Sequence, residues 1–456
     1  MFYNNPKKES DIYATAVFIG LIVYRIIIDN IYIYVISPLY SYSGLTCNTS
    51  VPKCLLSWGL FFVFYILIRG LVLSDKEHIS TIIAVTIYII SFIPFTSIVY
   101  MGLAPKIFII EMSIYWSLLL ILLLFIDRSQ RKQTPILTLG DYAIKDEAAT
   151  FIGIVASLTV IFVSWIYTNF HFQLNLDVYE QRALASRFPM PQLIRYMFTW
   201  SRAIIPVMFA YCLINRKILN SIWYFLVSFI SFGVDGSKTV LFMPFLVFAV
   251  VIIGKKISFK AIKIVLIYGM IAVSIISFIV YYAGRSIWLV SLFIRRVLYV
   301  PALLNVYYFD YFSKHEPDYF RSGFLSRLGA NSPYAKDNGV AYTIGKIYYH
   351  NPLTGANNGL FSDAIANMGM VGIIIMPFVV AFVLWLFDRC TYGLDKRIIL
   401  ASAMFISCTL VSSPLTTTLM THGLIVMMLI TAVITRDNYL ESSVMKNKEL
   451  IKARLT

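Results

Sequence analysis

The sequence predicts an all-α polytopic membrane protein, and its composition and its repeated apolar runs are the observations that predict it. Of the 456 residues, 59% are hydrophobic and only 13% are charged, whereas about a quarter of an ordinary soluble domain is charged. Apolar runs of about 20 residues recur along almost the whole chain, which is the length an α-helix needs to cross a bilayer. Because helices satisfy their own backbone hydrogen bonds in lipid, we expect one transmembrane domain over residues 1–456.

About a dozen apolar segments are candidates for membrane-spanning helices. The first lacks a small-residue cleavage site behind it, so it is interpreted as a retained helix rather than a signal peptide. Two short segments are joined by the turn DGSK at 235–238, so they are expected to form a hairpin that spans the membrane wholly or in part. The expected helices cover residues 13–37, 54–73, 79–102, 107–126, 150–169, 197–214, 219–234, 239–254, 262–283, 364–387, 398–413 and 420–435.

The distribution of lysine and arginine predicts which loops lie inside the cell. If the N-terminus is cytoplasmic, every segment expected inside is basic, as in the 127–149 connection with Arg128, Arg131 and Lys132. Both termini are then cytoplasmic. Because the basic residues are explained first by the side of the membrane on which they lie, the net charge of +15 does not call for a nucleic-acid partner. The same orientation places two larger loops outside, at 170–196 and 284–363.

These two outer loops are basic, although topology does not require it. One interpretation is that long loops translocate regardless of charge and that their arginines are merely solvated. The other is a binding site, because the planar arginine fork binds a phosphate at two points and is always charged. If 285–300 is a helix, Arg285 and Arg296 lie on one stripe roughly 16 Å apart, with Arg295 on a neighbouring face. The tyrosines and tryptophans of the large loop suit either sugar faces or a membrane interface.

Transfer of a sugar to a hydroxyl gains from a general base, and the outer loops offer several candidates. No spacing singles one of them out. The run HEPD at 315–318 lacks the histidine pairing of a helical zinc site, so no metal is expected. P-loop, Rossmann and G-x-S-x-G patterns are also missing from the sequence, which gives no support to nucleotide use or serine-hydrolase chemistry. The candidates are His171, Asp177, Glu180, His315, Glu316, Asp318, His350 and Asp363.

Charged residues inside apolar segments are costly and need a partner or a function. Arg25 and Asp29 are four residues apart, and we expect them to pair with each other. Glu111 has Arg69 as an expected partner. Either pair would instead mark a proton path if the protein were a transporter.

Five cysteines are present, and three of them fall within or at the ends of apolar segments, where packing explains them. Cys47 and Cys54 share a short polar loop. A disulfide between them is one option if that loop faces an oxidising compartment, and free thiols are the other.

Four patches resemble O-antigen polymerases of the Wzy type. They are DVYEQR at 177–182, DGSKT at 235–239, IRRVLYVPALLNVYYFDYFSK at 294–314 and NNGLFSDAIANMGMVG at 357–372. The resemblance implies a multi-pass enzyme of the bacterial inner membrane with a GT-C-like fold and two functional periplasmic loops. Such an enzyme joins undecaprenyl-diphosphate-linked oligosaccharide repeats, with the growing chain as donor and a single repeat as acceptor. It implies no cofactor, and its partners are that lipid-linked oligosaccharide, membrane lipid and a chain-length regulator in the same membrane.

The chemistry of the outer loops and the resemblance together give candidates for two roles. The catalytic candidates are His315 and Glu316, taken from the general bases of the outer loops, and Asp363, which also lies in one of the four patches. The residues expected to bind the diphosphate or the rest of the substrate are Arg182, Lys238, Arg285, Arg295, Arg296, Asn357 and Asn367.

Three other functions are kept as alternatives. An O-antigen ligase would share the architecture but transfer the polymer to lipid A core. A flippase would handle the same ligand, but it would be expected to have short loops on both sides, unlike the 284–363 segment. A secondary transporter is supported only by the charges within helices and would tolerate changes at Arg295 and Arg296.

Overall fold

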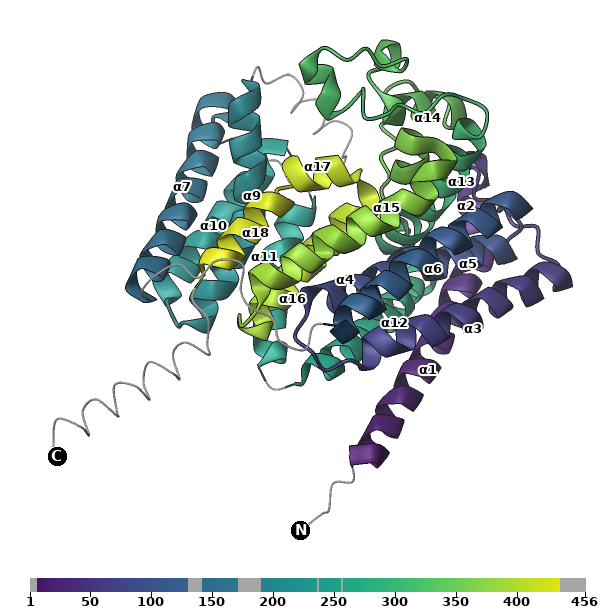
Figure 1. Cartoon of the computed structure of the whole chain (residues 1–456), viewed down its shortest axis with the longest axis horizontal. Helices are drawn as coiled ribbons and strands as arrows, with labels where there is room; N and C mark the ends of the chain where they lie inside the picture. The colour runs from purple at the N-terminus through teal and green to yellow at the C-terminus, as the bar shows by residue number, and fades with distance from the viewer. Residues whose placement is uncertain (1–5, 130–141, 171–189, 236–237, 256, 435–456) are drawn as a thin grey trace.

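The computed structural model describes residues 6–129, 142–170, 190–235, 238–255 and 257–434, and every regular element within them is a helix (Figure 1). Nine helices in this described part are long and apolar enough to cross a membrane. The expectation of an all-α, multi-pass membrane protein is therefore confirmed at this level.

The helices follow one another with short connections, as their bounds show. They are α1 (Pro6–Ile31), η1 (Tyr32–Ile36), α2 (Ser37–Tyr40), η2 (Ser41–Ser43), α3 (Val51–Leu73), α4 (Ile79–Ile87), η3 (Tyr88–Phe92), α5 (Ile93–Tyr100), α6 (Lys106–Ser129), α7 (Tyr142–Thr168), α9 (Gln192–Ile214), α10 (Ile218–Asp235), α11 (Lys238–Gly254), α12 (Phe259–Gly284), η4 (Val290–Tyr299), α13 (Val300–Phe312), η5 (Phe324–Leu328), η6 (Ala335–Asp337), α14 (Val340–Tyr348), α15 (Phe361–Thr391), α16 (Lys396–Ser412), α17 (Leu415–Met420) and α18 (Leu424–Val433).

The nine long helices do not coincide one to one with the twelve expected segments. Three expected segments form shorter apolar helices, Ile218–Val234, Val240–Gly254 and Leu424–Val433. The segment expected at 398–413 is α16, of 17 residues. Conversely, Val290–Phe312 is long and apolar enough to be a span, although its sequence was assigned to the large outer loop. Its mean hydropathy of 1.3 is the lowest of the nine, because it contains two arginines and several tyrosines.

The helices form two groups with two further helices, α15 and α16, between them. Helices α1, α3, α6 and α12 pack around α4 and α5, while α7, α9, α10 and α11 pack with one another (Figure 1). Helix α15 contacts α4 and α6, and α16 contacts α4, α9 and α11, so these two helices join the groups.

Burial separates the interior helices from those that face lipid. The continuous run Ile79–Tyr100, made of α4, η3 and α5, lies wholly inside the protein. Large apolar side chains stay exposed on the surrounding helices, such as Phe62 of α3, Phe125 of α6 and Trp165 of α7. Lipid covers such side chains in a membrane protein, so their exposure agrees with the predicted environment.

Of the two expected charge pairs within helices, one is formed. Arg25 is fully buried, its Nε donates to Asp29 Oδ2 at 2.8 Å, and its Nη2 donates to Ser57 Oγ at 2.6 Å. The pairing of Glu111 with Arg69 is wrong, because the two residues lie at opposite ends of neighbouring helices. Gly70 packs against Leu124 of α6, and that residue is roughly 20 Å along α6 from Glu111.

The cysteines of the described chain are all free thiols, so no disulfide joins Cys47 to Cys54 in this structure. Cys47 Sγ instead lies 3.7 Å from Met101 Sδ. Cys212 and Cys390 are buried among apolar side chains, as their sequence context predicts.

Candidate functional site

A polar cavity of about 580 Å³ lies where η4 meets the end of the first span and the segment that follows α14. Its size falls within the range of ligand sites in proteins. The lining residues include two arginines and no carboxylate, so the cavity suits an anion. They are Tyr42, Ser43, Leu45, Arg295, Arg296, Val300, Leu304, Tyr349, Asn351, Thr354, Gly355, Ala356 and Asn357.

The arginines are held in place by the wide turns of η4, a π-helical segment. Such segments are rare and are frequent at functional sites. Ile294 and Leu298 are buried and fix one face of η4 to the protein. At its end, the Tyr299 hydroxyl donates to the Ile28 carbonyl at 2.8 Å, and its ring packs on Tyr32 at 4.6 Å. Arg295 and Arg296, on the remaining surface, both reach the cavity.

The guanidinium of Arg295 is held in position and has a hydrogen-bond donor with no acceptor among the described residues. Its guanidinium lies over the Tyr40 ring at 4.4 Å from the ring centre, which fixes the side chain by a cation–π contact. Its Nε is buried and has no hydrogen-bond partner among the described residues. A buried donor without a partner costs about 1–3 kcal/mol, and a hydrogen bond from Nε to a ligand oxygen would remove this cost. Arg296 is exposed beside it.

Asn357 reaches the same cavity because the segment before α15 is tied down on both sides. The next residue, Asn358, is buried, and its Nδ2 donates to the Pro301 carbonyl, to Asn305 Oδ1 and to Ser362 Oγ at 2.9–3.0 Å. These bonds join α13 to α15. Asn305, Asn358 and Ser362 had not been singled out in the sequence, although asparagine within an apolar run signals a buried polar contact.

Gly359 provides the other anchor of this segment. Its amide donates to the Val411 carbonyl at 3.0 Å. A Cβ at this position would lie 2.0 Å from the Leu410 carbonyl oxygen and 2.4 Å from that of Ser413. Only glycine permits such close backbone contact, so the sequence NNG places Asn357 at the cavity and fastens the chain to the end of α16.

An aromatic group lies next to the cavity. The rings of Tyr307 and Tyr348 stack at 4.3 Å with an interplanar angle of 11°. The Tyr348 hydroxyl donates to Asp310 Oδ2 at 2.6 Å. Burial, followed by this bond to Asp310, raises the pKa of Tyr348 well above its ordinary value, so the hydroxyl remains protonated.

The three catalytic candidates do not line this cavity in the part of the chain described. His315 stacks on the Tyr311 ring at 4.0 Å, and its Nδ1 lies 2.8 Å from the Tyr311 carbonyl. Glu316 is exposed and pairs with Arg321 at 2.8 Å. Asp363 is buried at the start of α15, where Oδ2 accepts from the Leu415 amide at 2.8 Å and Oδ1 accepts from Asn367 at 2.7 Å.

The remaining predicted substrate residues lie apart from Arg295, Arg296 and Asn357. Asn367 connects Asp363 to the Phe320 amide, which donates to its Oδ1 at 3.0 Å, so its side chain is occupied within the protein. Arg285 ends α12 with a left-handed φ of 50° and is exposed. It is therefore outside the helix that contains Arg296, and the expected stripe shared by these two arginines is not formed, because residues 285–287 interrupt it.

Two of the predicted residues cannot be placed in the site. Lys238 is the first residue of α11, in the second group of helices, and its side chain lies outside the described part of the structure. Arg182 lies outside the described residues altogether. The roles assigned to both residues stay predictions.

A histidine that had not been predicted lies between α17 and α18. Its Nε2 is 3.0 Å from Ser413 Oγ, and Ser413 belongs to the backbone that contacts Gly359. Burial and then the positive charge of Arg202 lower the pKa of His422 to about 4, so the imidazole is neutral at neutral pH. The only sequence signal for a role of His422 would have been its position just before the apolar run of α18.

The geometry combines two arginines, an amide and hydroxyl groups in a cavity at one end of the helices. No group of three His, Cys, Asp or Glu side chains that could hold a metal ion is found in the described residues. A comparison of this chain with protein-family models, with curated proteins and with solved structures finds no match.

Proposed function

We propose that the protein polymerises undecaprenyl-diphosphate-linked oligosaccharide repeats into a surface polysaccharide such as O-antigen, by glycosyl transfer at the periplasmic face of the bacterial inner membrane. The observation that carries this proposal is the meeting of Arg295, Arg296 and Asn357 in one cavity. These residues come from two of the four patches that resemble Wzy-type polymerases. A two-arginine cavity at one end of apolar helices suits a diphosphate whose lipid remains in the membrane.

In this reaction the bond between the donor sugar and the diphosphate breaks, and the diphosphate takes the electron pair. Arg295 and Arg296 would hold the diphosphate and stabilise the negative charge that develops on it. A new bond forms between the donor sugar carbon and a hydroxyl oxygen of the acceptor. Asn357 would hydrogen-bond to the sugar part, in keeping with the substrate-binding role expected for it.

The acceptor hydroxyl also loses a proton, which a base on the protein takes up. His315 and Glu316 are exposed on the segment after α13 and remain candidates. Asp363 is a weaker candidate, because both of its oxygens already accept hydrogen bonds within the protein. Its contacts favour a structural role in joining α15 to α17.

An O-antigen ligase would use the same diphosphate chemistry, and only the acceptor distinguishes it. Transport is less well supported, since Arg25 and Asp29 pair with each other and Arg25 donates to Ser57 and Thr96. These contacts account for the buried charge of Arg25 without a proton path.

The test is a gel of surface polysaccharide from cells that lack the gene and then receive one of three versions. Wild type should restore a ladder of long chains, Arg296→Ala should give a core that carries single repeats, and Lys336→Ala should restore the ladder. Lys336 is an exposed basic residue outside the cavity lining and is the control for loss of charge.

The three possible failures have different meanings. Loss of every repeat in the deletion strain would indicate a ligase or a flippase. An unchanged ladder in that strain would contradict a role in this polysaccharide. A normal ladder with Arg296→Ala would remove the cavity from the mechanism.

A further inference from the structure

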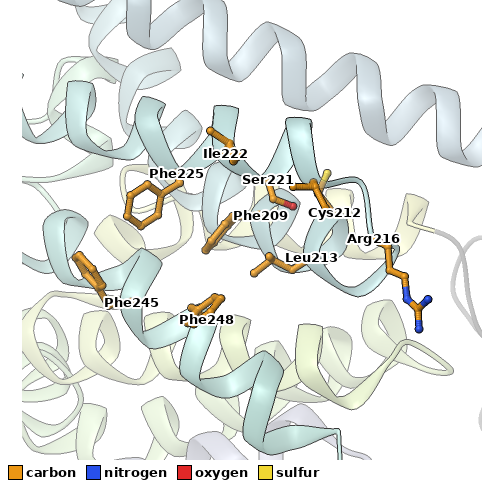
Figure 2. Close-up of a pocket in the computed structure, with 10 residues that line it drawn as sticks. Phe209, Cys212, Leu213, Arg216, Ser221, Ile222, Phe225, Phe245 and Phe248 are labelled. Carbon is orange, nitrogen blue, oxygen red and sulfur yellow. The ribbon is translucent and has the colours of Figure 1, made fainter.

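A second cavity, of about 420 Å³, lies between α9, α10 and α11, and its walls are almost wholly apolar (Figure 2). We call it the apolar groove. It contains no carboxylate, and its polar side chains are Arg216 and Ser221, with the thiol of Cys212. The lining residues are Phe209, Cys212, Leu213, Arg216, Ile218, Ser221, Ile222, Phe225, Phe245 and Phe248.

The apolar groove has a charged end and an apolar end. Figure 2 shows the rings of Phe225 and Phe245 at one end and Arg216 at the other, with its guanidinium turned away from the rings. Arg216 and Phe209 are separated by about two helical turns, roughly 10 Å along the helix axis. The groove therefore matches a molecule with a charged head and a hydrocarbon tail.

The positive charge of Arg216 is available at this end. Arg216 is exposed, and no salt bridge to it is formed among the described residues, where Asp146 pairs with Lys217 instead. Lys217 next to it is neutralised, because its Nζ bonds both oxygens of Asp146 at 2.9 and 2.8 Å. Arg216 thus adds an uncompensated cation to an apolar wall, which is the combination that basic pockets between membrane helices use for anionic head groups.

The apolar groove is at the opposite end of the helices from the polar cavity. Gly423, at the start of α18, packs against Trp200 and Ala203 in the first half of α9, and this places α17 and the start of α15 near that half. Arg216 follows the last turn of α9, at the end that the positive-inside rule assigns to the cytoplasm. A diphosphate bound by Arg295 and Arg296 would be too far away to contact Arg216.

We propose that the apolar groove binds an anionic phospholipid of the cytoplasmic leaflet, with its phosphate on Arg216 and one acyl chain among Phe209, Phe225, Phe245 and Phe248. The walls supply contact area for the chain, and the guanidinium supplies a bidentate contact for the phosphate. Binding here does not require the transfer reaction and is independent of the function proposed above.

The experiment uses the purified full-length protein, stripped of lipid in detergent and then incubated with either phosphatidylglycerol or phosphatidylcholine. Native mass spectrometry counts the lipids that remain bound. Wild type should retain phosphatidylglycerol better than phosphatidylcholine. Arg216→Ala should weaken phosphatidylglycerol binding roughly fivefold to tenfold, as expected for one basic residue at a membrane surface, and should leave phosphatidylcholine unchanged.

Two further variants make the result specific. Arg216→Gly also removes the charge, and it suits the left-handed backbone, with φ of 57°, so it should fold at least as well as wild type while losing the same lipid preference. Ser221→Trp fills the apolar groove and should reduce binding of both lipids. Arg128→Ala removes an exposed arginine at the same end of the helices, outside the lining of the apolar groove, and should bind like wild type.

Several results would overturn the proposal. The first is equal retention of phosphatidylglycerol by wild type and both Arg216 variants. The second is an equal loss with Arg128→Ala, which would show that general surface charge accounts for retention. The third is displacement of phosphatidylglycerol from Arg216 by polyprenyl diphosphate, which would make the apolar groove a substrate site. None of these outcomes depends on whether the polymer ladder forms.

Discussion

At the scale of single residues, the geometry of Arg296 matters as well as its charge. A guanidinium offers a planar fork to a diphosphate, whereas a lysine ammonium is a point charge on a flexible chain. We expect Arg296→Lys to restore little polymer in the deletion strain, close to the result with Arg296→Ala. The measurement is the polysaccharide ladder at matched protein amounts. Full chain length with lysine would mean that the site requires charge alone.

His422 gives a prediction about pH. Its ordinary pKa is 6.5, and burial with the charge of Arg202 lowers it to about 4 in the folded protein. Between these values the unfolded chain binds a proton that the folded protein does not bind. Stability is therefore full above about pH 6.5 and decreases as the pH falls toward about 4.

Replacement of His422 by Asn should remove this contribution. The melting temperature of the purified protein, measured from pH 7 to pH 4 in one detergent, should fall less steeply for His422→Asn than for wild type. Parallel curves for the two proteins would show that His422 does not titrate differently on unfolding.

At the scale of elements, the most regular helices could be predicted from hydropathy alone. The expected segments 54–73, 107–126 and 262–283 correspond to α3, α6 and α12, because each has an uninterrupted apolar run. The helix at 290–312 is the least apolar of the nine long helices, so hydropathy separates it poorly from the outer loop in which it was expected. Arg295 and Arg296 line the cavity and Tyr299 bonds the Ile28 carbonyl of the first span, and a hydropathy pattern does not show such contacts.

The candidate site, like the helices, could be predicted from the sequence only in part. The chemistry of arginine pointed to Arg295 and Arg296 as ligands of a diphosphate, and the resemblance added Asn357 as a substrate residue, but spacing could not show that they meet. Their meeting depends on the backbone contact of Gly359 with the end of α16 and on the bonds of Asn358. Both are tertiary contacts between segments far apart in the chain.

The asparagine network between α13 and α15 is itself testable. Asn358 Nδ2 donates to Asn305 Oδ1 at 3.0 Å, and both side chains are buried. Asn305→Ala and Asn358→Ala should each lower stability by about 0.5–2 kcal/mol, since hydrogen bonds between membrane helices have this size. Because the residues share one interaction, the double variant should lose less than the sum of the single losses.

The measurement is thermal unfolding of wild type, the two single variants, the double variant and one control, all purified in one detergent. Ser407→Ala is the control, because among the described residues this buried serine bonds only to the Ala403 carbonyl of its own helix, at 2.7 Å. The control should change stability little. Additive losses for the two asparagines would argue against coupling of α13 to α15 through this bond.

At the scale of the whole molecule, the helices α15 and α16 join two groups whose cavities differ in chemistry. The polar cavity lies at the end where α15 begins, and the apolar groove lies at the other end, beside the second group. A protein that extends a lipid-linked polymer has to hold a charged head group at one membrane surface while its helices stay in lipid. The polar cavity at one end of the helices and the apolar groove at the other end agree with this requirement.

The path of residues 290–312 decides the topology of the whole chain. Tyr299 bonds the Ile28 carbonyl, yet on either side of it Arg295 lies over Tyr40 and Tyr307 donates to the Ser43 carbonyl at 3.4 Å. Tyr40 and Ser43 are roughly three to four turns further along the first span than Ile28. All three contacts are with the second half of the first span, Asp11–Ser43, so we expect both ends of this helix on one side of the membrane.

Alkaline phosphatase fusions test this topology, since the enzyme is active only outside the cytoplasm. Fusions after residue 287 and after residue 330 should both be active, and a fusion after residue 140 should be inactive. Activity after 287 but not after 330 would mean that 290–312 crosses the membrane, which would place α14 and Asn357 on the cytoplasmic side. Such a result would separate the segment that follows α13 from any periplasmic substrate and would contradict the proposed reaction. Activity only after residue 140 would invert the orientation of every helix, and the groove at Arg216 would then face the periplasm.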